Sequence, residues 1–223
     1  MISSPIPPSR PRVATRSELQ WLDVLRRCDA KPQVAARWAR IFAEVIKPDS
    51  FSRGDAELPD FIGQVMHESA MLERLEENLN YSAARIVELG QASKPGTRWR
   101  SMVPQATKLA YNPKAFAEAC YGGRLGNVKP GDGFKYRGRG LVMVTGFDNY
   151  ALVSKATGLD LINNPDLLGQ PAPALKAAIA WWEGRVPDAA MGDVRKVTRA
   201  VNGGDFGLAH RLALTERAAQ ALA

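Results

Sequence analysis

The stretch FIGQVMHESAMLERLEENLNYSA, residues 61–83, decides how this chain is interpreted, because it sets carboxylates against an apolar helical stripe. A carboxyl group on such a stripe is partly shielded from water, which favours the protonated form that a general acid needs. The alternative is an acid at the edge of the stripe that pairs with an arginine. A helix is predicted over residues 59–72, and Glu68 lies on one of its faces together with three apolar residues: Phe61, Val65 and Leu72.

A second carboxylate, Glu77, lies among polar neighbours, where a carboxylate stays ionised. If the helix continued from Glu68 to Glu77, it would turn by about 900° between them and place the two side chains on opposite faces. The two can share a site only if the helix ends between them, and the turn-forming residues after Glu77 favour such a break. Paired carboxyl groups, one protonated and one ionised, are what glycoside hydrolysis needs. The alternative is that Glu73, Glu76 and Glu77 form a solvated helix end.

A metal site is not indicated. His67 and Glu68 begin like the H-E-x-x-H helix of zinc proteases, but Met71 stands where the second histidine is needed. Cys28 and Cys120 have no metal-ligand spacing, and the sequence leaves open whether they pair. We therefore expect neither a metal nor a cofactor.

The composition is that of a globular chain with a basic surplus: 30 Lys and Arg against 23 Asp and Glu, a net charge of +7. Residues 48–93 hold 3 basic and 9 acidic residues, whereas residues 94–139 hold 10 basic and 2 acidic residues. Such a surplus favours an anionic partner, whether nucleic acid, a wall polymer or a membrane surface. No signal peptide or membrane-spanning stretch is evident, so we expect a protein made soluble in the cytoplasm.

The segment YRGRGLVMVTGFDNY, residues 136–150, is rich in glycine and arginine. Its glycines let the backbone approach a ligand closely, and Arg137 and Arg139 can bind anions or orient carboxylates. Met143 breaks the G-x-G-x-x-G pattern of nucleotide sites, and a solvated basic turn is the alternative. Asn202, before two glycines, either stops a helix or contacts a ligand.

Helical periodicity along the chain predicts a mainly α fold. Ser17 and Gln20 have the spacing of a capping box, and Ser82 can cap a helix that stops before Gly90. Residues 1–12 are predicted to be a loose tail and residues 91–104 a loop. Further helices are predicted at residues 32–46, 113–121, 147–157, 173–185, 193–201 and 206–222.

Taken together, these segments resemble glycoside hydrolase family 19 of the lysozyme-like superfamily, especially its phage endolysin branch. The resemblance covers roughly residues 58–205 and rests on ordered motifs: the opening stretch, GRLGN, YRGRGLVMVTGFDNY, NPDLL and AVNGG. It implies a lysozyme-like two-lobed fold with a substrate groove between the lobes. The large lobe would comprise residues 13–84 and 136–223, and the small lobe residues 85–135.

The resemblance also implies roles. Glu68 matches the general acid, Glu77 the base that activates water, and Thr145 the residue that helps hold that water. Family members invert configuration, which needs carboxyl groups roughly 6.5–9.5 Å apart. Met143 departs from the glutamine usual in the family, and Phe147 stands where a basic residue is common, so the fine substrate contacts differ. The residues expected to contact substrate are Tyr81, Arg137, Arg139, Asn149 and Asn202.

The predicted function is hydrolysis of peptidoglycan between N-acetylmuramic acid and N-acetylglucosamine by a phage lysin. The protein would act in the periplasm or cell wall after its release from the host cytoplasm. It would work as a monomer, without nucleic acid, and anionic outer-membrane lipids would be further partners. The alternatives are a chitinase, a non-catalytic basic protein that binds walls or nucleic acid, and a bacterial toxin against rival walls.

Overall fold

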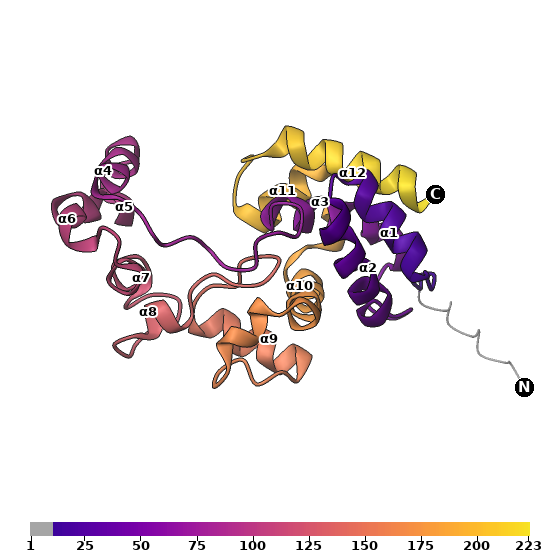
Figure 1. Cartoon of the computed structure of the whole chain (residues 1–223), viewed down its shortest axis with the longest axis horizontal. Helices are drawn as coiled ribbons and strands as arrows, with labels where there is room; N and C mark the ends of the chain where they lie inside the picture. The colour runs from indigo at the N-terminus through magenta and orange to yellow at the C-terminus, as the bar shows by residue number, and fades with distance from the viewer. Residues whose placement is uncertain (1–10) are drawn as a thin grey trace, which may run out of the picture. The chain divides into compact units, whose positions relative to one another are not determined.

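The structure, a computed structural model, describes residues 11–223, which are mainly helical and contain no β-strand (Figure 1). The predicted mainly α fold is therefore confirmed. The predicted tail lies outside the described residues except for Pro11 and Arg12. No described helix is long and apolar enough to cross a membrane. Within residues 11–223, no group of three or more His, Cys, Asp or Glu side chains could hold a metal ion.

The chain divides into two compact units. Unit 1 comprises Met1–Glu73 and Ala178–Ala223, and unit 2 comprises Arg74–Ala177. The predicted small lobe, residues 85–135, covers only the middle of unit 2. Residues 136–177 belong with that middle because the Phe147 N–H donates to Asn127 Oδ1 at 2.9 Å and the Asp148 N–H donates to the Leu125 carbonyl oxygen at 3.0 Å.

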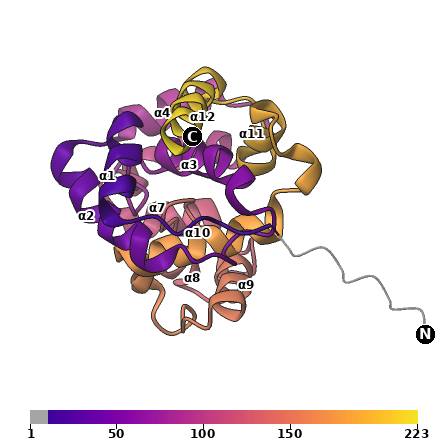
Figure 2. The same cartoon turned by 90° about the vertical axis from the view of Figure 1, so that its right-hand side faces the viewer.

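Unit 1 is built on three early helices and the C-terminal helices. The predicted capping box is confirmed, because the Ser17 side chain accepts from the Gln20 N–H and the Gln20 side chain accepts from the Ser17 N–H. The first two helices lie side by side in both views, and the last helix packs along the third (Figures 1 and 2). The helices are α1 (Glu18–Arg27), α2 (Pro32–Val45), α3 (Leu58–Glu68), α11 (Val194–Asn202), α12 (Leu208–Leu222) and the end of α10 (Pro171–Arg185).

Gly63 explains how closely α3 and α12 approach each other. A Cβ atom at this position would lie 2.2 Å from Oγ1 of Thr215 on α12, which is inside van der Waals contact. The opposite side of α3 faces a core of aromatic rings, in which Phe61 makes edge contacts with Phe51 at 4.9 Å and Trp182 at 5.5 Å. The close contact holds α3, which carries Glu68, against α12.

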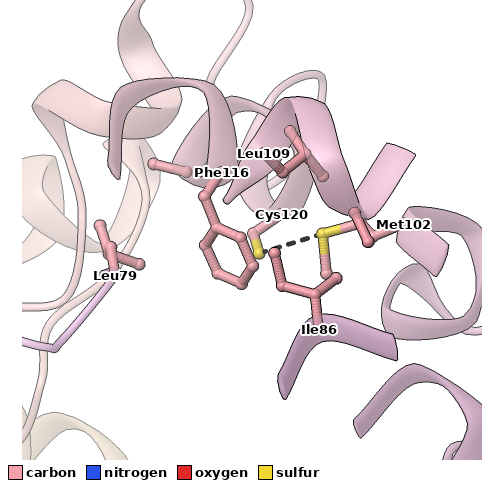
Figure 3. Close-up of a cluster of buried hydrophobic side chains, with 8 residues drawn as sticks. Leu79, Ile86, Met102, Leu109, Phe116 and Cys120 are labelled. Atoms are coloured by element: carbon pink, nitrogen blue, oxygen red, sulfur yellow. Dashed lines mark hydrogen bonds between the residues drawn. The ribbon is translucent and has the colours of Figure 1, made fainter. Parts of the chain in front are cut away.

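Unit 2 holds its own apolar core, formed by Leu79, Ile86, Met102, Leu109, Phe116 and Cys120 with Ala106 and Ala117 (Figure 3). Cys120 Sγ lies 3.7 Å from Met102 Sδ, and both cysteines are free thiols. Burial raises the pKa of each thiol to about 12. The helices are α4 (Ala83–Ala92), α5 (Arg98–Met102), α6 (Ala106–Leu109), α7 (Pro113–Tyr121), α8 (Asp132–Lys135), α9 (Phe147–Thr157) and the start of α10.

Two sequence predictions in unit 2 are wrong. The helix capped by Ser82 does not stop before Gly90 but runs to Ala92. Gly90 lies inside it because a Cβ atom there would be 2.7 Å from the Trp99 carbonyl oxygen, so the glycine permits close packing. The segment predicted to be a loop, residues 91–104, contains α5, whose first turn is capped by the Thr97 side chain.

Asp60 on α3 should make the stability of the fold depend on pH. It is 3% exposed; its Oδ2 accepts from the Gly192 N–H at 2.8 Å, while Oδ1 has no partner among the described residues. Burial raises its pKa, although the Gly192 hydrogen bond opposes the shift. A raised folded-state pKa favours folding at low pH, and this contribution is lost as pH rises through the folded pKa.

We therefore expect Asp60→Asn to raise the Tm at pH 7 by about 2–4 °C, because it removes the buried charge and keeps an acceptor for Gly192. The gain should disappear near pH 3, where Asp60 is protonated in both states. Thermal melts of the two proteins across this range measure the effect. The exposed Asp49→Asn is the control, and a variant that is less stable than the parent at pH 7 would contradict the prediction.

Candidate active site

The helix that carries Glu68 ends at that residue, and a left-handed turn follows. Ala70, Met71 and Leu72 have φ values of 50°, 56° and 66°. Such a conformation costs about 1–2 kcal/mol for each residue that is not glycine, so other contacts must hold it. The helix was predicted to continue to Leu72, which is wrong. The break required between Glu68 and Glu77 is present, and it lies directly after Glu68.

Ser69 and Trp38 hold this turn. Ser69 Oγ donates to the Val65 carbonyl oxygen at 2.5 Å and accepts from the Leu72 N–H at 2.9 Å. Trp38 Nε1 of α2 donates to the Leu72 carbonyl oxygen at 3.1 Å, and the Leu72 side chain is fully buried. The turn therefore redirects the chain after Glu68 by contacts inside unit 1.

Glu68 pairs with an arginine from α12. Arg211 Nη2 lies 2.5 Å from Glu68 Oε1, and Arg211 Nη1 donates to Gln64 Oε1 at 2.5 Å. Arg211 is almost fully buried, whereas the Glu68 side chain is 22% exposed. The arginine partner considered in the sequence analysis is thus present. The pair fixes the orientation of the carboxyl group through Oε1, and Oε2 is the oxygen that could carry a proton toward a ligand.

The residue before Glu68 belongs to a histidine pair. His67 Nδ1 lies 2.8 Å from Nδ1 of His210 on α12, so one ring nitrogen donates and the other accepts. Partial burial lowers the pKa of His67, and the charge of Arg211 lowers it further. The neutral form of His67 is therefore favoured beside the Glu68–Arg211 ion pair.

Glu77 lies in unit 2, where both of its carboxylate oxygens receive hydrogen bonds. Oε1 accepts from the Gly138 N–H at 2.5 Å, and Oε2 accepts from the Tyr121 hydroxyl at 2.6 Å. The Glu77 N–H in turn donates to the Gly138 carbonyl oxygen at 3.0 Å. Burial raises the pKa of Tyr121, and the negative charge of Glu77 raises it further, so the phenol remains a donor. The carboxylate is held in one orientation by two donors.

Thr145 and this carboxylate both lie next to Gly138. A Cβ atom on Gly138 would lie 3.1 Å from both Glu77 Oε1 and Thr145 Oγ1. A side chain at this position would therefore crowd both oxygens, and glycine leaves the space next to them free. Thr145 Oγ1 donates to the carbonyl oxygen of Met143, which has a φ of 49°. Its lone pairs can therefore accept a hydrogen bond from a water molecule near Glu77.

Two residues expected to bind substrate have contacts inside unit 2. Asn149 Nδ2 donates to the Thr145 carbonyl oxygen at 2.7 Å and so supports the turn that presents Thr145. The Tyr81 ring stacks on Phe116 at 4.7 Å and meets Trp99 edge-on at 5.5 Å. Burial raises the pKa of Tyr81, and the charge of Glu77 acts in the same direction. Glu77, Thr145, Asn149 and Tyr81 are thus associated within one unit.

The two arginines predicted to bind substrate have internal roles instead. Arg139 is 1% exposed, and its guanidinium contacts Asp166 at 2.6 Å and the Tyr150 hydroxyl at 3.1 Å. Arg137 Nε pairs with Glu76 Oε1 at 2.7 Å. A buried guanidinium has no surface to offer a sugar, so the prediction for Arg139 does not fit its position. Arg137 and Arg139 hold the glycine-rich segment in place.

Asn202 lies in unit 1 at the end of α11. Its Oδ1 accepts from the Gly204 N–H at 2.8 Å, and its Nδ2 donates to the Phe206 carbonyl oxygen at 3.1 Å. The side chain expected to contact a ligand is therefore used to shape its own loop. Tyr121 and Arg211 are not recognisable from the sequence, because the hydrogen bonds that join them to Glu77 and Glu68 span 44 and 143 residues.

Comparisons with known proteins agree on one family. The glycoside hydrolase family 19 pattern described as "Chitinase class I" matches residues 87–196, which include Thr145 but neither carboxylate. A Haemophilus influenzae protein described as "Glycosyl hydrolase family 19 domain-containing protein" is 38% identical over 159 residues, covering 69% of this chain and 74% of that protein. Chitinase 11 of Oryza sativa subsp. japonica is 43% identical over 60 residues, covering 26% of this chain and only 23% of that protein.

A solved structure has the same fold. A crystal structure of a chitinase C mutant aligns with a TM-score of 0.52 at 16% identity, over 94% of this chain and 93% of that chain. At this level of identity the likeness concerns the arrangement of the helices and not the chemistry of the side chains.

Proposed function

Because the chain belongs to glycoside hydrolase family 19, we propose that it hydrolyses the glycan of bacterial peptidoglycan between N-acetylmuramic acid and N-acetylglucosamine. The chain is a glycoside hydrolase with a lysozyme-like, mainly helical fold. The observation that carries the proposed chemistry is the Glu77 carboxylate, which is held by Tyr121 and Gly138 with the Thr145 hydroxyl beside it. This is the arrangement that a general base with a positioned water requires.

In the proposed reaction, the Glu68 carboxyl group donates its proton to the glycosidic oxygen as the bond from that oxygen to C1 breaks. Glu77 removes a proton from a water molecule, whose oxygen forms the new bond to C1 from the opposite face. Thr145 accepts a hydrogen bond from that water and orients it. The products are two shorter glycans, one with an inverted hemiacetal at C1. Arg211 holds the Glu68 carboxyl group in a fixed orientation.

The choice of peptidoglycan rests on charge. Unit 2 holds 14 basic and 8 acidic residues, a net charge of +6, which is most of the +7 of the chain. Peptide stems give peptidoglycan carboxylates that chitin lacks, so a basic unit gains affinity for the wall polymer but not for chitin. Anionic outer-membrane lipids would be attracted for the same reason. A chitinase is the second candidate, since Chitinase 11 and other relatives carry that description.

Mass spectrometry of digests made from purified murein and from chitin separates the candidates. We expect soluble muropeptides with new N-acetylmuramic acid reducing ends and little release of N-acetylglucosamine oligomers from chitin. The rate on murein should fall as salt is raised, because the attraction is electrostatic. Release from chitin alone would favour the chitinase, and new N-acetylglucosamine ends in murein would place the cleavage at the other glycosidic bond. Binding without turnover would indicate a non-catalytic protein.

Wall lysis by a phage lysin is the proposed biological role, with a monomer acting in the periplasm or cell wall after its release from the host cytoplasm. A bacterial toxin directed at rival walls uses the same chemistry. Production of the chain in the cytoplasm of a Gram-negative host, with and without a membrane-permeabilising partner, tests the role. Lysis only when the membrane is permeabilised is the outcome expected for a lysin without its own export route.

A further inference from the structure

We propose that the ring of Phe206 is a stacking platform for one sugar ring of the glycan chain, beside Glu68 on unit 1. The inference rests on the proposed function, because it assumes that Glu68 acts on a glycan. Phe206 is 80% exposed, the highest exposure of any aromatic side chain among the described large hydrophobic residues that face solvent. A phenylalanine ring that stays in solvent contributes little hydrophobic free energy to folding. If the structure nevertheless fixes its position, a role in binding is indicated.

The loop that carries Phe206 is held at several points. At its start, the Asn202 side chain binds both the Gly204 N–H and the Phe206 carbonyl oxygen. In its middle, Asp205 receives two hydrogen bonds from Arg199 of α11, at 2.7 and 3.1 Å. At its end, Gly207 adopts a φ of 70° and precedes α12. The backbone is therefore fixed while the ring is left in solvent, which reduces the ordering cost of binding.

The same loop is joined to the residues around Glu68. Arg211 Nε donates to the Phe206 carbonyl oxygen at 3.2 Å, and its Nη2 pairs with Glu68. The Phe206 ring meets the His67 ring edge-on with centroids 6.4 Å apart. A Cβ atom on Gly207 would lie 2.3 Å from His67 Cε1, so the loop backbone rests directly on that ring. One guanidinium thus positions both the proposed acid and the platform.

A sugar ring is the occupant that these surroundings favour. Around Phe206 the loop offers an asparagine, three glycines and an aspartate, and these do not form a continuous apolar patch. A protein or lipid partner would need such a patch, whereas one pyranose ring needs a single aromatic face for its C–H groups and polar groups around it for its hydroxyls. The glycan continues beyond the cleaved bond on both sides, so rings next to the Glu68 position require contacts of this kind.

Binding is best measured in the full chain carrying Glu77→Gln, because that change lies in unit 2 and leaves Phe206, Arg211 and Glu68 intact. Depletion of this protein from solution by purified murein sacculi at fixed salt gives its Kd. Adding Phe206→Ala should raise the Kd about tenfold, whereas Phe206→Trp should keep it within about twofold. Leu19→Ala is the matched control, since Leu19 is 76% exposed on α1 and remote in sequence from the loop.

In the otherwise unchanged enzyme, Phe206→Ala should raise KM far more than it lowers kcat, and the Tm should stay near that of the parent. A merely structural role would lower the Tm and would not be rescued by tryptophan. An unchanged Kd for Phe206→Ala, or no binding of sacculi by the parent, would overturn the platform. Retained hydrolysis by Glu77→Gln would instead overturn the proposed function, so the two failures are distinguishable.

Discussion

Replacement of Glu68 by glutamine should reduce the hydrolysis of purified cell walls by about 10²–10⁴-fold, which is the contribution typical of a positioned general acid. Glutamine retains an oxygen that accepts from Arg211 and has nearly the same volume, so the left-handed turn and the hydrogen bond from Arg211 should persist although the ion pair is lost. What it lacks is a proton that can be transferred to the glycosidic oxygen. Release of reducing ends, measured at saturating substrate, gives the loss in kcat.

The matched control is Glu73→Gln, which removes an exposed carboxylate at the end of the same turn. Glu73 pairs with Lys31 at 3.0 Å on the surface, where such pairs contribute little, so activity should stay close to that of the parent. A Glu68→Gln variant that lyses walls at nearly the normal rate would rule Glu68 out as the acid.

Local signals predicted many element boundaries of this fold. The helix predicted at residues 147–157 forms at Phe147–Thr157. Gly146, with a non-helical φ of 86°, precedes its first residue, and Gly158 adopts the left-handed φ of 71° that ends it. The capping box at Ser17 and the single caps at Ser82 and Asn112 likewise depend on neighbouring residues. Such signals act over a few residues, and a sequence displays them directly.

The end of α3 could not be placed in this way. No glycine marks it, and its left-handed residues are alanine, methionine and leucine, which avoid that conformation in isolation. The turn exists because Trp38, which is 34 residues away in sequence, donates to the Leu72 carbonyl oxygen and Ser69 closes the turn from within. The apolar periodicity continues through Leu72, since that residue is buried in the core after the helix has ended.

The sequence indicates which residues are candidates for the site, but it does not indicate which residues hold them in place. Glu68, Glu77 and Thr145 are recognisable from ordered motifs, whereas their supports come from distant helices: Arg211 from α12 and Tyr121 from α7. For Arg139 the local pattern is misleading, because an arginine between two glycines suggests an exposed residue that contacts a ligand. Its burial depends on Asp166 and Tyr150, which the local pattern does not indicate.

The second large effect is expected for Glu77→Gln, which should lower kcat by about 10²–10⁴-fold with a smaller change in KM. Glutamine can keep the hydrogen bond from Gly138, and the Tyr121 hydroxyl can reverse its role and accept from the new amide. The fold of unit 2 should therefore persist while the base is lost. Release of reducing ends from purified cell walls at limiting and at saturating substrate measures KM and kcat separately.

Tyr121→Phe separates the base from its support. The change removes one of the two donors to Glu77 and leaves the carboxylate, so we expect a loss in kcat of about tenfold, the scale of one hydrogen bond to a charged group. A loss as large as that of Glu77→Gln would show that Tyr121 does more than orient the carboxylate. A nearly normal kcat in Glu77→Gln itself would show that Glu77 is not the group that activates water.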